Sequence, residues 1–307
     1  MSEMNVPGEY LVKLNYSSGI LITGIGGGWD ILAGMPLAYE LVMNKRNVVA
    51  MANYSSVKQI FSRLAMPGDD PEYFIAQQIS TPLYLLGREG VQTVRRGYEQ
   101  ILTEHKISHI IMVDGGVDSI MHGTEENCGT ILEDSISMSA IAQLPNVVKI
   151  LVCMGMTTEI EEGLSHFRAL QNIATLAMDR GFLGSCSLTP QMEAFQYYKD
   201  IAIKAGEKAH RKSHIHSRVI PAVEGASIVQ ATSAKLARTM GNPSDEEVFI
   251  NPLMGIYWFF DFDKVAKHNV LLDAIKLSGT FTDAQLLYRN AMDKIKDKVS
   301  TKRLAFP

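Results

Sequence analysis

The chain has 307 residues, of which 46% are hydrophobic and 20% are charged, with a formal net charge of −4. These values are ordinary for a folded soluble protein, and the slight acidic excess argues against nucleic acid as the main partner. We expect neither a membrane span nor a signal peptide, because no apolar run of that length and no charged-then-apolar leader is visible. Cys128, Cys153 and Cys186 are odd in number and far apart, which favours reduced thiols in a cytoplasmic protein.

The first half of the chain alternates short apolar runs with segments of helical periodicity. The apolar runs predict strands over 19–23, 47–51, 109–113 and 147–153. Apolar residues at helical spacing predict helices over 31–43, 89–105 and 130–143. This alternation predicts a Rossmann-like α/β fold, in which helices cover both faces of a parallel sheet built mainly before residue 155.

Helical patterns dominate after residue 155. We expect helices over 159–178, 191–210 and 224–239, the second with Thr189 as N-cap and Pro190 at its first position. Residues 255–261 read as an aromatic strand or core segment, and a last helix is expected to begin at Thr282, which forms a capping box with Gln285. With no visible linker, residues 1–307 are predicted to form one compact unit, with 1–155 supplying the core sheet and 156–307 a mostly helical portion packed on it.

The junction after the first predicted strand carries the strongest functional signal. An apolar run ends in a set of four glycines and one acid, Gly24, Gly26, Gly27, Gly28 and Asp30. Glycines let the backbone approach a ligand closely, and free N–H groups at a helix start favour an anion. We therefore predict an anion-binding loop, in which Asp30 caps the helix or presents its carboxylate to a metal or a substrate hydroxyl. The alternative is a tight turn with no ligand, since the spacing matches neither a dinucleotide fingerprint nor a P-loop.

The strand over 109–113 is followed by six carboxylates within 21 residues. Clustered carboxylates at a strand end can hold Mg²⁺ or act as a general base. The predicted catalytic residues are Asp118, Asp114, His122 and Glu125. His122 could pair with Asp118 as an acid–base unit, and the alternative is an ordinary loop histidine. Asp114 and Asp118 are also the predicted metal ligands, and Gly115, Gly116 and Thr130 are predicted ligand contacts. The alternative, helix caps and solvated loops, is favoured for Glu126 and Glu133.

These two segments carry a resemblance to DUF1152, a family of uncharacterised proteins of archaea and bacteria. Residues 24–30 resemble the glycine-rich opening motif of the family, with Trp29 where a further glycine is usual. The second motif is similar in order, through Val113, Asp114, Asp118, Gly123, Glu125, Thr130 and Asp134. In it, Val117 displaces a glycine and Thr130-Ile131 replaces Ser-Pro. The resemblance extends over about residues 19–290 and implies a Rossmann-like fold, but it supplies no reaction.

Three histidines and one asparagine are the remaining polar residues that could belong to a binding site. His210, His214 and His216 are interpreted as a solvated helix end, because the neighbouring Arg211 and Lys212 would repel a cation. Asn53 stands at the end of the second predicted strand, where a Rossmann dehydrogenase has Asp or Glu for the ribose hydroxyls. We keep Asn53 as a ligand-binding candidate, although an Asn there weakens the case for NAD.

The sequence as a whole predicts an enzyme of hydrolase or transferase type that acts on a nucleotide-like or phosphorylated small molecule. Mg²⁺ and a bound nucleotide are the candidate cofactors, a small-molecule ligand is the expected partner, and a homo-oligomer stays open. An NAD(P)-dependent oxidoreductase and a non-catalytic nucleotide-binding sensor or assembly subunit are the alternatives.

Overall fold

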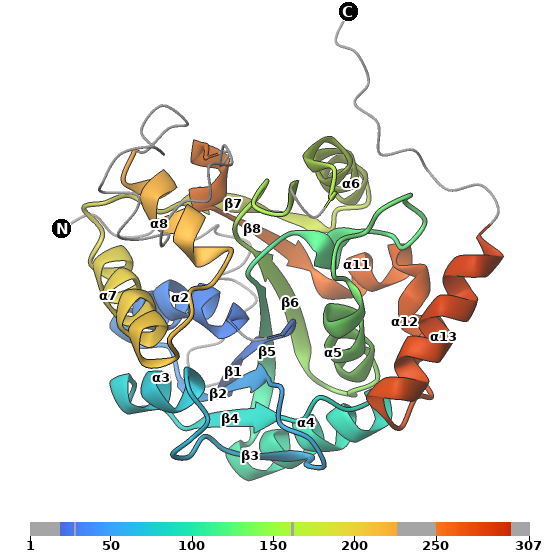
Figure 1. Ribbon diagram of the computed structural model, residues 1–307, viewed down its shortest axis with the longest axis horizontal. Coiled ribbons are helices and arrows are strands. Elements are labelled where there is room, and N and C mark those ends of the chain that lie inside the picture. Colours follow the sequence, from blue (N-terminus) through green and yellow to red (C-terminus); the bar gives the residue numbers. More distant parts are fainter. Residues whose placement is uncertain (1–18, 28, 161–162, 226–249, 296–307) are drawn as a thin grey trace, which may run out of the picture.

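The computed structural model describes residues 19–27, 29–160, 163–225 and 250–295. Eight strands form one sheet in the order β3-β4-β2-β1-β5-β6-β8-β7 (Figure 1). The strands are β1 (Gly19–Gly24), β2 (Val48–Tyr54), β3 (Ser62–Leu64), β4 (Leu83–Leu86), β5 (Ile107–Asp114), β6 (Val148–Cys153), β7 (Phe182–Ser187) and β8 (Ile256–Asp261).

Helices connect most of the strands. The α-helices are α2 (Met35–Met43), α3 (Glu72–Gln78), α4 (Val91–His105), α5 (Leu132–Ala142), α6 (His166–Met178), α7 (Glu193–Lys208), α8 (His216–Val223), α11 (Phe262–His268), α12 (Val270–Ile275) and α13 (Phe281–Lys294). Short 3₁₀ helices are η1 (Asp30–Gly34), η2 (Asp118–Ile120) and η4 (Pro252–Gly255).

The order of the strands in the sheet changes direction between β1 and β5. Strands β4, β2, β1, β5 and β6 are mutually parallel, whereas β3 and β8 pair antiparallel with their neighbours. From β1 the chain moves through β2 to β4 on one side, and it then returns to β5 and β6 on the other. The last residue of β1, Gly24, pairs with Val113 of β5. The carboxyl edge at this switch point is where open α/β sheets bind ligands.

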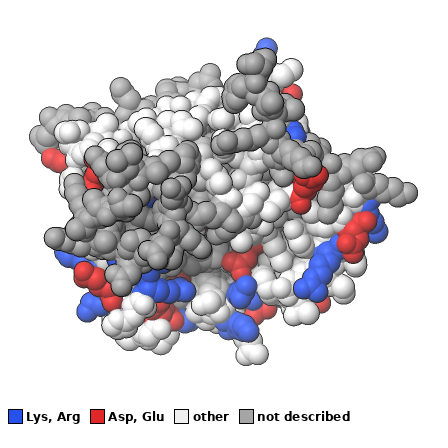
Figure 2. Space-filling model, turned by 45° about the horizontal axis from the view of Figure 1, so that its top comes forward, with Lys and Arg blue, Asp and Glu red and all other residues white. Residues whose placement is uncertain are grey.

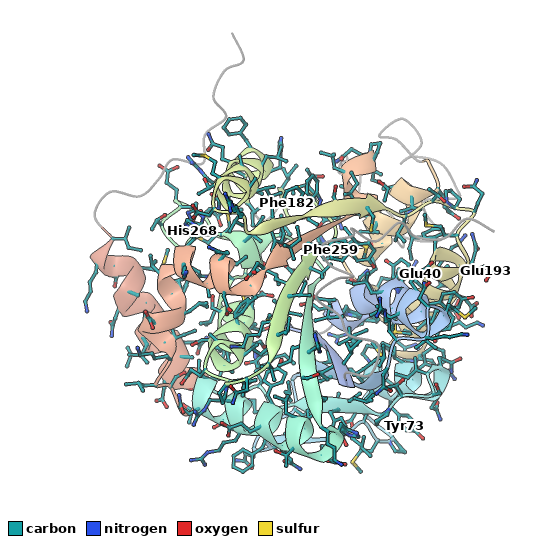
Figure 3. All side chains as sticks on the ribbon, turned by 180° about the vertical axis from the view of Figure 1, so that it is seen from behind. Glu40, Tyr73, Phe182, Glu193, Phe259 and His268 are labelled. Atoms are coloured by element: carbon teal, nitrogen blue, oxygen red, sulfur yellow. The ribbon has the colours of Figure 1, made fainter. Side chains whose placement is uncertain are left out.

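Two apolar layers hold the helices against the sheet, because successive strand residues face opposite sides. One layer joins Leu21, Ile110 and Leu151 to α4, α5, α6 and α11–α13. The other joins Ile22 and Ile111 to η1, α2, α3, α7 and α8. The two groups of helices lie on opposite faces in Figure 1, and in Figure 3 Phe259 of β8 lies in the interior whereas Tyr73 and Glu193 lie at the periphery.

The predicted α/β class, with a mostly parallel sheet flanked by helices and a helix-rich C-terminal half, is confirmed. Strands β3, β4 and β7 were not predicted, because β3 and β4 are short and β7 contains a glycine and two serines. The segment over 182–261 also extends the sheet with β7 and β8, so the C-terminal portion contributes strands as well as helices.

Several predicted helix boundaries are wrong. The helix over 31–43 divides into η1 and α2, and α6 begins after Ser165, whose side chain accepts a hydrogen bond from the Arg168 N–H. The N-cap of α7 is Met192 rather than Thr189. Thr280 and Asp283 form the capping box of α13, because Thr280 has the extended backbone of an N-cap and Thr282 already lies in the first turn.

Two further predictions from the sequence can be compared with the described residues only. The helix predicted over 224–239 falls almost wholly outside the described residues. Of the residues that are described, none forms a helix long and apolar enough to cross a membrane. Positive and negative side chains are interspersed over the described part of the face in Figure 2, as the small net charge leads us to expect.

Candidate functional site

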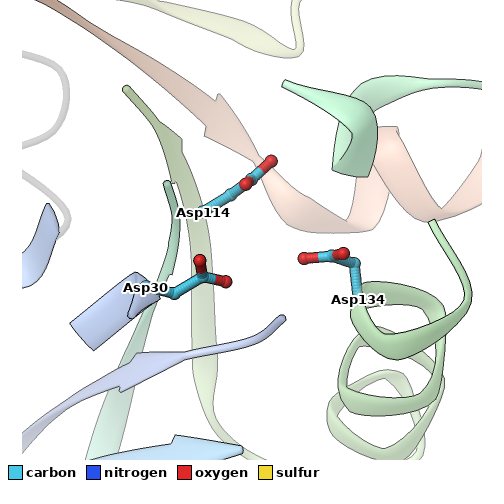
Figure 4. A group of neighbouring side chains, drawn as sticks. All are labelled: Asp30, Asp114 and Asp134. Carbon is cyan, nitrogen blue, oxygen red and sulfur yellow. The ribbon is translucent and has the colours of Figure 1, made fainter. Parts of the chain in front are cut away.

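Three aspartates from different elements converge at the switch point (Figure 4). Asp30 opens η1 just after β1, Asp114 ends β5, and Asp134 lies in the first turn of α5. One carboxylate oxygen from each lies within 4.8 Å of the other two. Because the three come from separate elements, this cluster is a product of the tertiary fold.

The three aspartates line a cavity of about 170 Å³, which we call the acid cavity. Asp118, Glu159 and His216 also line it, as do Gly26, Gly27, Trp29, Gly115, Gly116, Thr130, Ser213, His214 and Ile215. Its volume is well above the roughly 10–15 Å³ that a single water molecule needs on this measure. The acid cavity is therefore large enough for a cation with its water ligands or for a small oxyanion.

Hydrogen bonds fix two of the three aspartates. The N–H of Gly116 donates to Asp114 Oδ1 over 2.7 Å, and the Ser119 hydroxyl donates to Asp114 Oδ2. The N–H of Gly26 donates to Asp30 Oδ2 over 2.6 Å. Each carboxylate is thus held with at least one oxygen in a set direction, as a preorganised ligand site requires.

Asp134 differs from these two. Its side chain is 4% exposed, yet its Oδ1 atom accepts no hydrogen bond from any residue in the described part of the chain. Buried carboxylate oxygens are normally satisfied by a donor, so an unsatisfied one indicates a missing partner. The Oδ1 atom faces Gly26, whose Cβ, if present, would lie 2.8 Å away.

Burial raises the pKa values of all four aspartates of the cavity, and repulsion from neighbouring carboxylates adds to the rise for Asp30, Asp118 and Asp134. Burial is the largest cause for each of them, and it raises the pKa of Asp30, Asp118 and Asp134 well above the usual range. Repulsion from Asp114 adds to the effect on Asp30 and Asp134. For Asp114, hydrogen bonds from Ser119 and Gly116 offset part of the rise. The fold therefore disfavours the charged forms of these carboxyl groups unless a compensating positive charge, a proton or a cation, is bound.

At several glycines of the two motifs, a carboxylate oxygen lies so close to the backbone that a Cβ atom would not fit. A Cβ on Gly26 would lie 2.6 Å from Asp30 Oδ2, and one on Gly116 would lie 2.5 Å from Glu159 Oε2. Gly27 and Gly115 are similarly close to Glu133 and Asp30, and Gly24 is close to Asn53. Gly28 lies outside the described residues.

His216 corrects one interpretation made from the sequence. It is 2% exposed at the start of α8, so it is not part of a solvated helix end. Its Nε2 lies 3.0 Å from the Trp29 carbonyl oxygen, which can only accept, so Nε2 carries the proton. Its Nδ1 then accepts from the Tyr198 hydroxyl over 2.8 Å. Burial lowers the pKa of His216 to about 4, and the ring is therefore neutral near pH 7.

The other predicted site residues divide between the cavity and its surroundings. Asp118 lines the cavity and accepts a 3.1 Å hydrogen bond from the Thr130 hydroxyl. Glu125 instead accepts hydrogen bonds from the backbone of His122 and from Asn172, which outweigh burial and lower its pKa. His122 stacks on His268 with ring centroids 5.1 Å apart. Neither Glu125 nor His122 lines the acid cavity, so the structure does not bring the proposed His122–Asp118 pair together there.

Asn53 is fully buried beside the cavity rather than in it. Its side-chain amide donates to Glu72 Oε1 over 3.2 Å. Its Oδ1 atom fills the space where Gly24 lacks a Cβ. Asn53 therefore supports the packing of β1 against β2.

A second cavity of about 300 Å³ adjoins the first, and we call it the arginine cavity. Gly27 and Trp29 line both cavities. The remaining lining comes from Tyr54, Ser55, Ser56, Glu72, Arg88, Glu133 and Arg211. Glu133 lies here and its neighbour Asp134 in the acid cavity, so the start of α5 contributes to both.

The match to a known family covers most of this site. Residues 70–294 match the family described as "Protein of unknown function (DUF1152)". The chain belongs to the DUF1152 family. The matched region contains Asp114, Asp118, Asp134 and His216, whereas Asp30 and the glycine loop precede it. No curated protein and no solved structure matches the chain.

The residues that line the acid cavity of this DUF1152 protein but were not predicted as site residues are Trp29, Asp134, Glu159, Ser213, His214, Ile215 and His216. Asp134 and Glu159 looked like ordinary acids of helical segments, and His216 looked like a solvated residue. The spacing of Asp134 within the second motif was the one signal that could have identified it. Glu159 and His216 reach the cavity through packing that no local pattern reports.

Proposed function

We propose that this DUF1152 protein is a divalent-cation-dependent enzyme that acts on a phosphorylated small molecule, by hydrolysis or by phosphoryl transfer. Asp30, Asp114 and Asp134 would hold the cation. The observation that carries the proposal is the buried Asp134 Oδ1, which lacks a hydrogen-bond donor among the described residues and lies within a cluster of like charges.

The donor set favours a hard cation. All three groups offer oxygen, and no cysteine lines the acid cavity. Mg²⁺ and Mn²⁺ prefer carboxylate and water ligands and commonly bind through few carboxylates plus substrate phosphates. Such a cation, when bound, supplies positive charge that stabilises a transferring phosphoryl group.

Asp118 is the group that we assign to proton transfer. It lies in the same cavity, it is 2% exposed, and burial together with repulsion from Asp134 raises its pKa. A raised pKa makes a carboxylate a better base near neutral pH. In hydrolysis, a water oxygen forms a bond to phosphorus and the water proton passes to Asp118. The phosphorus–oxygen bond to the leaving group breaks, and the leaving oxygen takes a proton from solvent.

The other expectations have less support. A nicotinamide-dependent oxidoreductase is disfavoured because Asn53 is buried against Glu72 and lines neither cavity. A non-catalytic sensor remains an outcome of the experiment below. A cytoplasmic location is part of the proposal, and it accords with three free, buried cysteines.

The proposal is tested by measuring phosphate release from a panel of sugar phosphates and nucleotides, with Mn²⁺ and with EDTA. We expect release from at least one compound with Mn²⁺ and none with EDTA. Asp118→Asn should abolish release while the protein still binds Mn²⁺. Asp273→Asn, the same change at a side chain that is 91% exposed on α12, is the matched control. Binding without turnover across the panel would favour the sensor, and release unaffected by EDTA would reject the cation.

A further inference from the structure

The arginine cavity contains recognition groups that the proposed chemistry does not use. Its volume of about 300 Å³ is at the lower end of the range for small-molecule sites. The wall combines two guanidinium groups with the hydroxyls of Ser55 and Ser56. Guanidinium groups match phosphate geometry, and hydroxyl groups can hydrogen-bond a sugar.

Arg211 is the cationic group with the most freedom to bind a ligand. Its side chain is exposed and its guanidinium carbon lies 5.5 Å from the centroid of the Trp29 ring. The contacts of its guanidinium among the described residues are this ring and the charge of Glu72, whose pKa it helps to hold down against the effect of burial. Trp29 lines both cavities, so Arg211 stands at their common wall.

Arg88, the second guanidinium in the wall of the arginine cavity, is held in place by two contacts. Its Nη2 lies 2.6 Å from Glu133 Oε1, and its guanidinium carbon lies 4.3 Å from the centroid of the Phe281 ring. Its Nε has no partner among the described residues. Because Arg88 lines the cavity while it stays paired with Glu133, its guanidinium adds positive charge near a bound anion.

The carboxylates of this cavity are already engaged. Glu133 pairs with Arg88, and Glu72 is 5% exposed and hydrogen-bonded to the side chains of Asn53 and Ser55. The arginine cavity therefore differs sharply from the acid cavity, where four aspartates and Glu159 repel anions unless a cation is present.

We propose that the arginine cavity binds a second phosphate of the substrate, so that the substrate is a sugar carrying two phosphate groups. One phosphate lies against Arg211 and Arg88, the sugar passes Gly27 and Trp29, and the reacting phosphate lies in the acid cavity. This substrate class rests on the proposed function, whereas anion binding in the arginine cavity stands without it.

The test measures binding of ribose 5-phosphate by calorimetry in EDTA, where the acid cavity repels anions. We expect millimolar or tighter binding, at least about ten-fold stronger than that of ribose, and weakened about ten-fold or more by Arg211→Gln. Arg96→Gln is the matched control, because Arg96 is exposed, lies over the ring of Phe61 and lines neither cavity. With Mn²⁺ present, fructose 1,6-bisphosphate should bind about ten-fold more tightly than ribose 5-phosphate.

The outcomes separate the two proposals. Absence of ribose 5-phosphate binding up to about 10 mM in EDTA, or binding unchanged by Arg211→Gln, would overturn the phosphate site. Binding in EDTA that depends on Arg211, combined with no affinity for Mn²⁺, would retain the phosphate site and reject the proposed function. Equal affinity for the two sugar phosphates in Mn²⁺ would reject a substrate with two phosphates.

Discussion

Replacing Asp134 with Asn removes one negative charge from the acid cavity and changes the shape of the side chain very little. One carboxylate oxygen of Asp134 lies within 4.8 Å of an oxygen from Asp30 and one from Asp114. At that separation, two full charges repel by about 3.5 kcal/mol with an effective dielectric constant of about 20. Bound protons reduce this repulsion, because the pKa values of all three groups are raised. We therefore expect metal-free Asp134→Asn protein to be more stable than wild type by about 1 kcal/mol or more.

The same substitution should weaken cation binding. At a Mn²⁺ concentration about 100 times Kd, binding stabilises the folded wild type by about 2.7 kcal/mol, which raises Tm by about 5 °C in a chain of this size. Loss of one charged ligand is expected to raise Kd about 100-fold. At the same concentration the gain then falls to about 0.4 kcal/mol, and the shift in Tm falls below about 1 °C.

Thermal unfolding in EDTA and in Mn²⁺ measures both effects near neutral pH. Asp273→Asn controls for the chemical change itself and should leave both Tm values unchanged, since Asp273 is 91% exposed. A lower Tm of Asp134→Asn in EDTA, together with an unchanged shift in Mn²⁺, would refute both the electrostatic argument and the ligand role of Asp134.

Three further outcomes are expected. Gly26→Ala should abolish Mn²⁺ binding in an electron paramagnetic resonance titration while far-UV circular dichroism is retained, because its Cβ would lie 2.6 Å from Asp30 Oδ2 and 2.8 Å from Asp134 Oδ1. Burial lowers the pKa of His216 to about 4, so the folded state resists its protonation. The free energy of unfolding in urea should therefore fall as the pH drops from about 6.5 toward 4, by up to about 3 kcal/mol, and an equal fall in His216→Gln would contradict this. The three buried cysteines should react with iodoacetamide only after unfolding, as mass spectrometry can show, because burial raises the pKa of each thiol.

The sequence was sufficient for the architecture because apolar periodicity is a local property. The four predicted strands became β1, β2, β5 and β6, which form the parallel centre of the sheet. β4 is a run of only four residues between Pro82 and Gly87, and β7 mixes serine and glycine with apolar residues, so neither stood out. Their strand conformation depends on pairing with β2 and β8, which the sequence pattern does not report.

The sequence could predict those site residues that lie at the end of a strand or just after it. Asp114 ends β5, Asp118 lies shortly after it, and Asp30 follows the glycine loop after β1, so an α/β sheet was expected to place them at one edge. Asp134 and Glu133 are neighbours with the same local pattern, yet one lines the acid cavity and the other the arginine cavity. Glu133 lies against Gly27 and Asp134 against Gly26, and this difference is a tertiary property.

Glu125 and His216 show how contacts between segments decide the surroundings of a side chain. Glu125 looked catalytic because of its acidic, glycine-rich setting, but its carboxylate is used to hold its own loop against Asn172. His216 looked solvated because Arg211 and Lys212 precede it, but α8 begins at His216 and carries it into the interior beside Tyr198. In both cases the decisive partner is distant in sequence.

Diffraction from crystals grown with Mn²⁺ tests the central claim most directly, because anomalous scattering locates the ion without reference to activity. We predict a single strong peak between Asp30, Asp114 and Asp134, at about 2.0–2.2 Å from one oxygen of each, including Asp134 Oδ1. The peak should be absent in Asp134→Asn crystals grown under the same conditions. A wild-type acid cavity without anomalous density at saturating Mn²⁺, or with Asp134 Oδ1 bonded to a protein donor instead, would contradict the account.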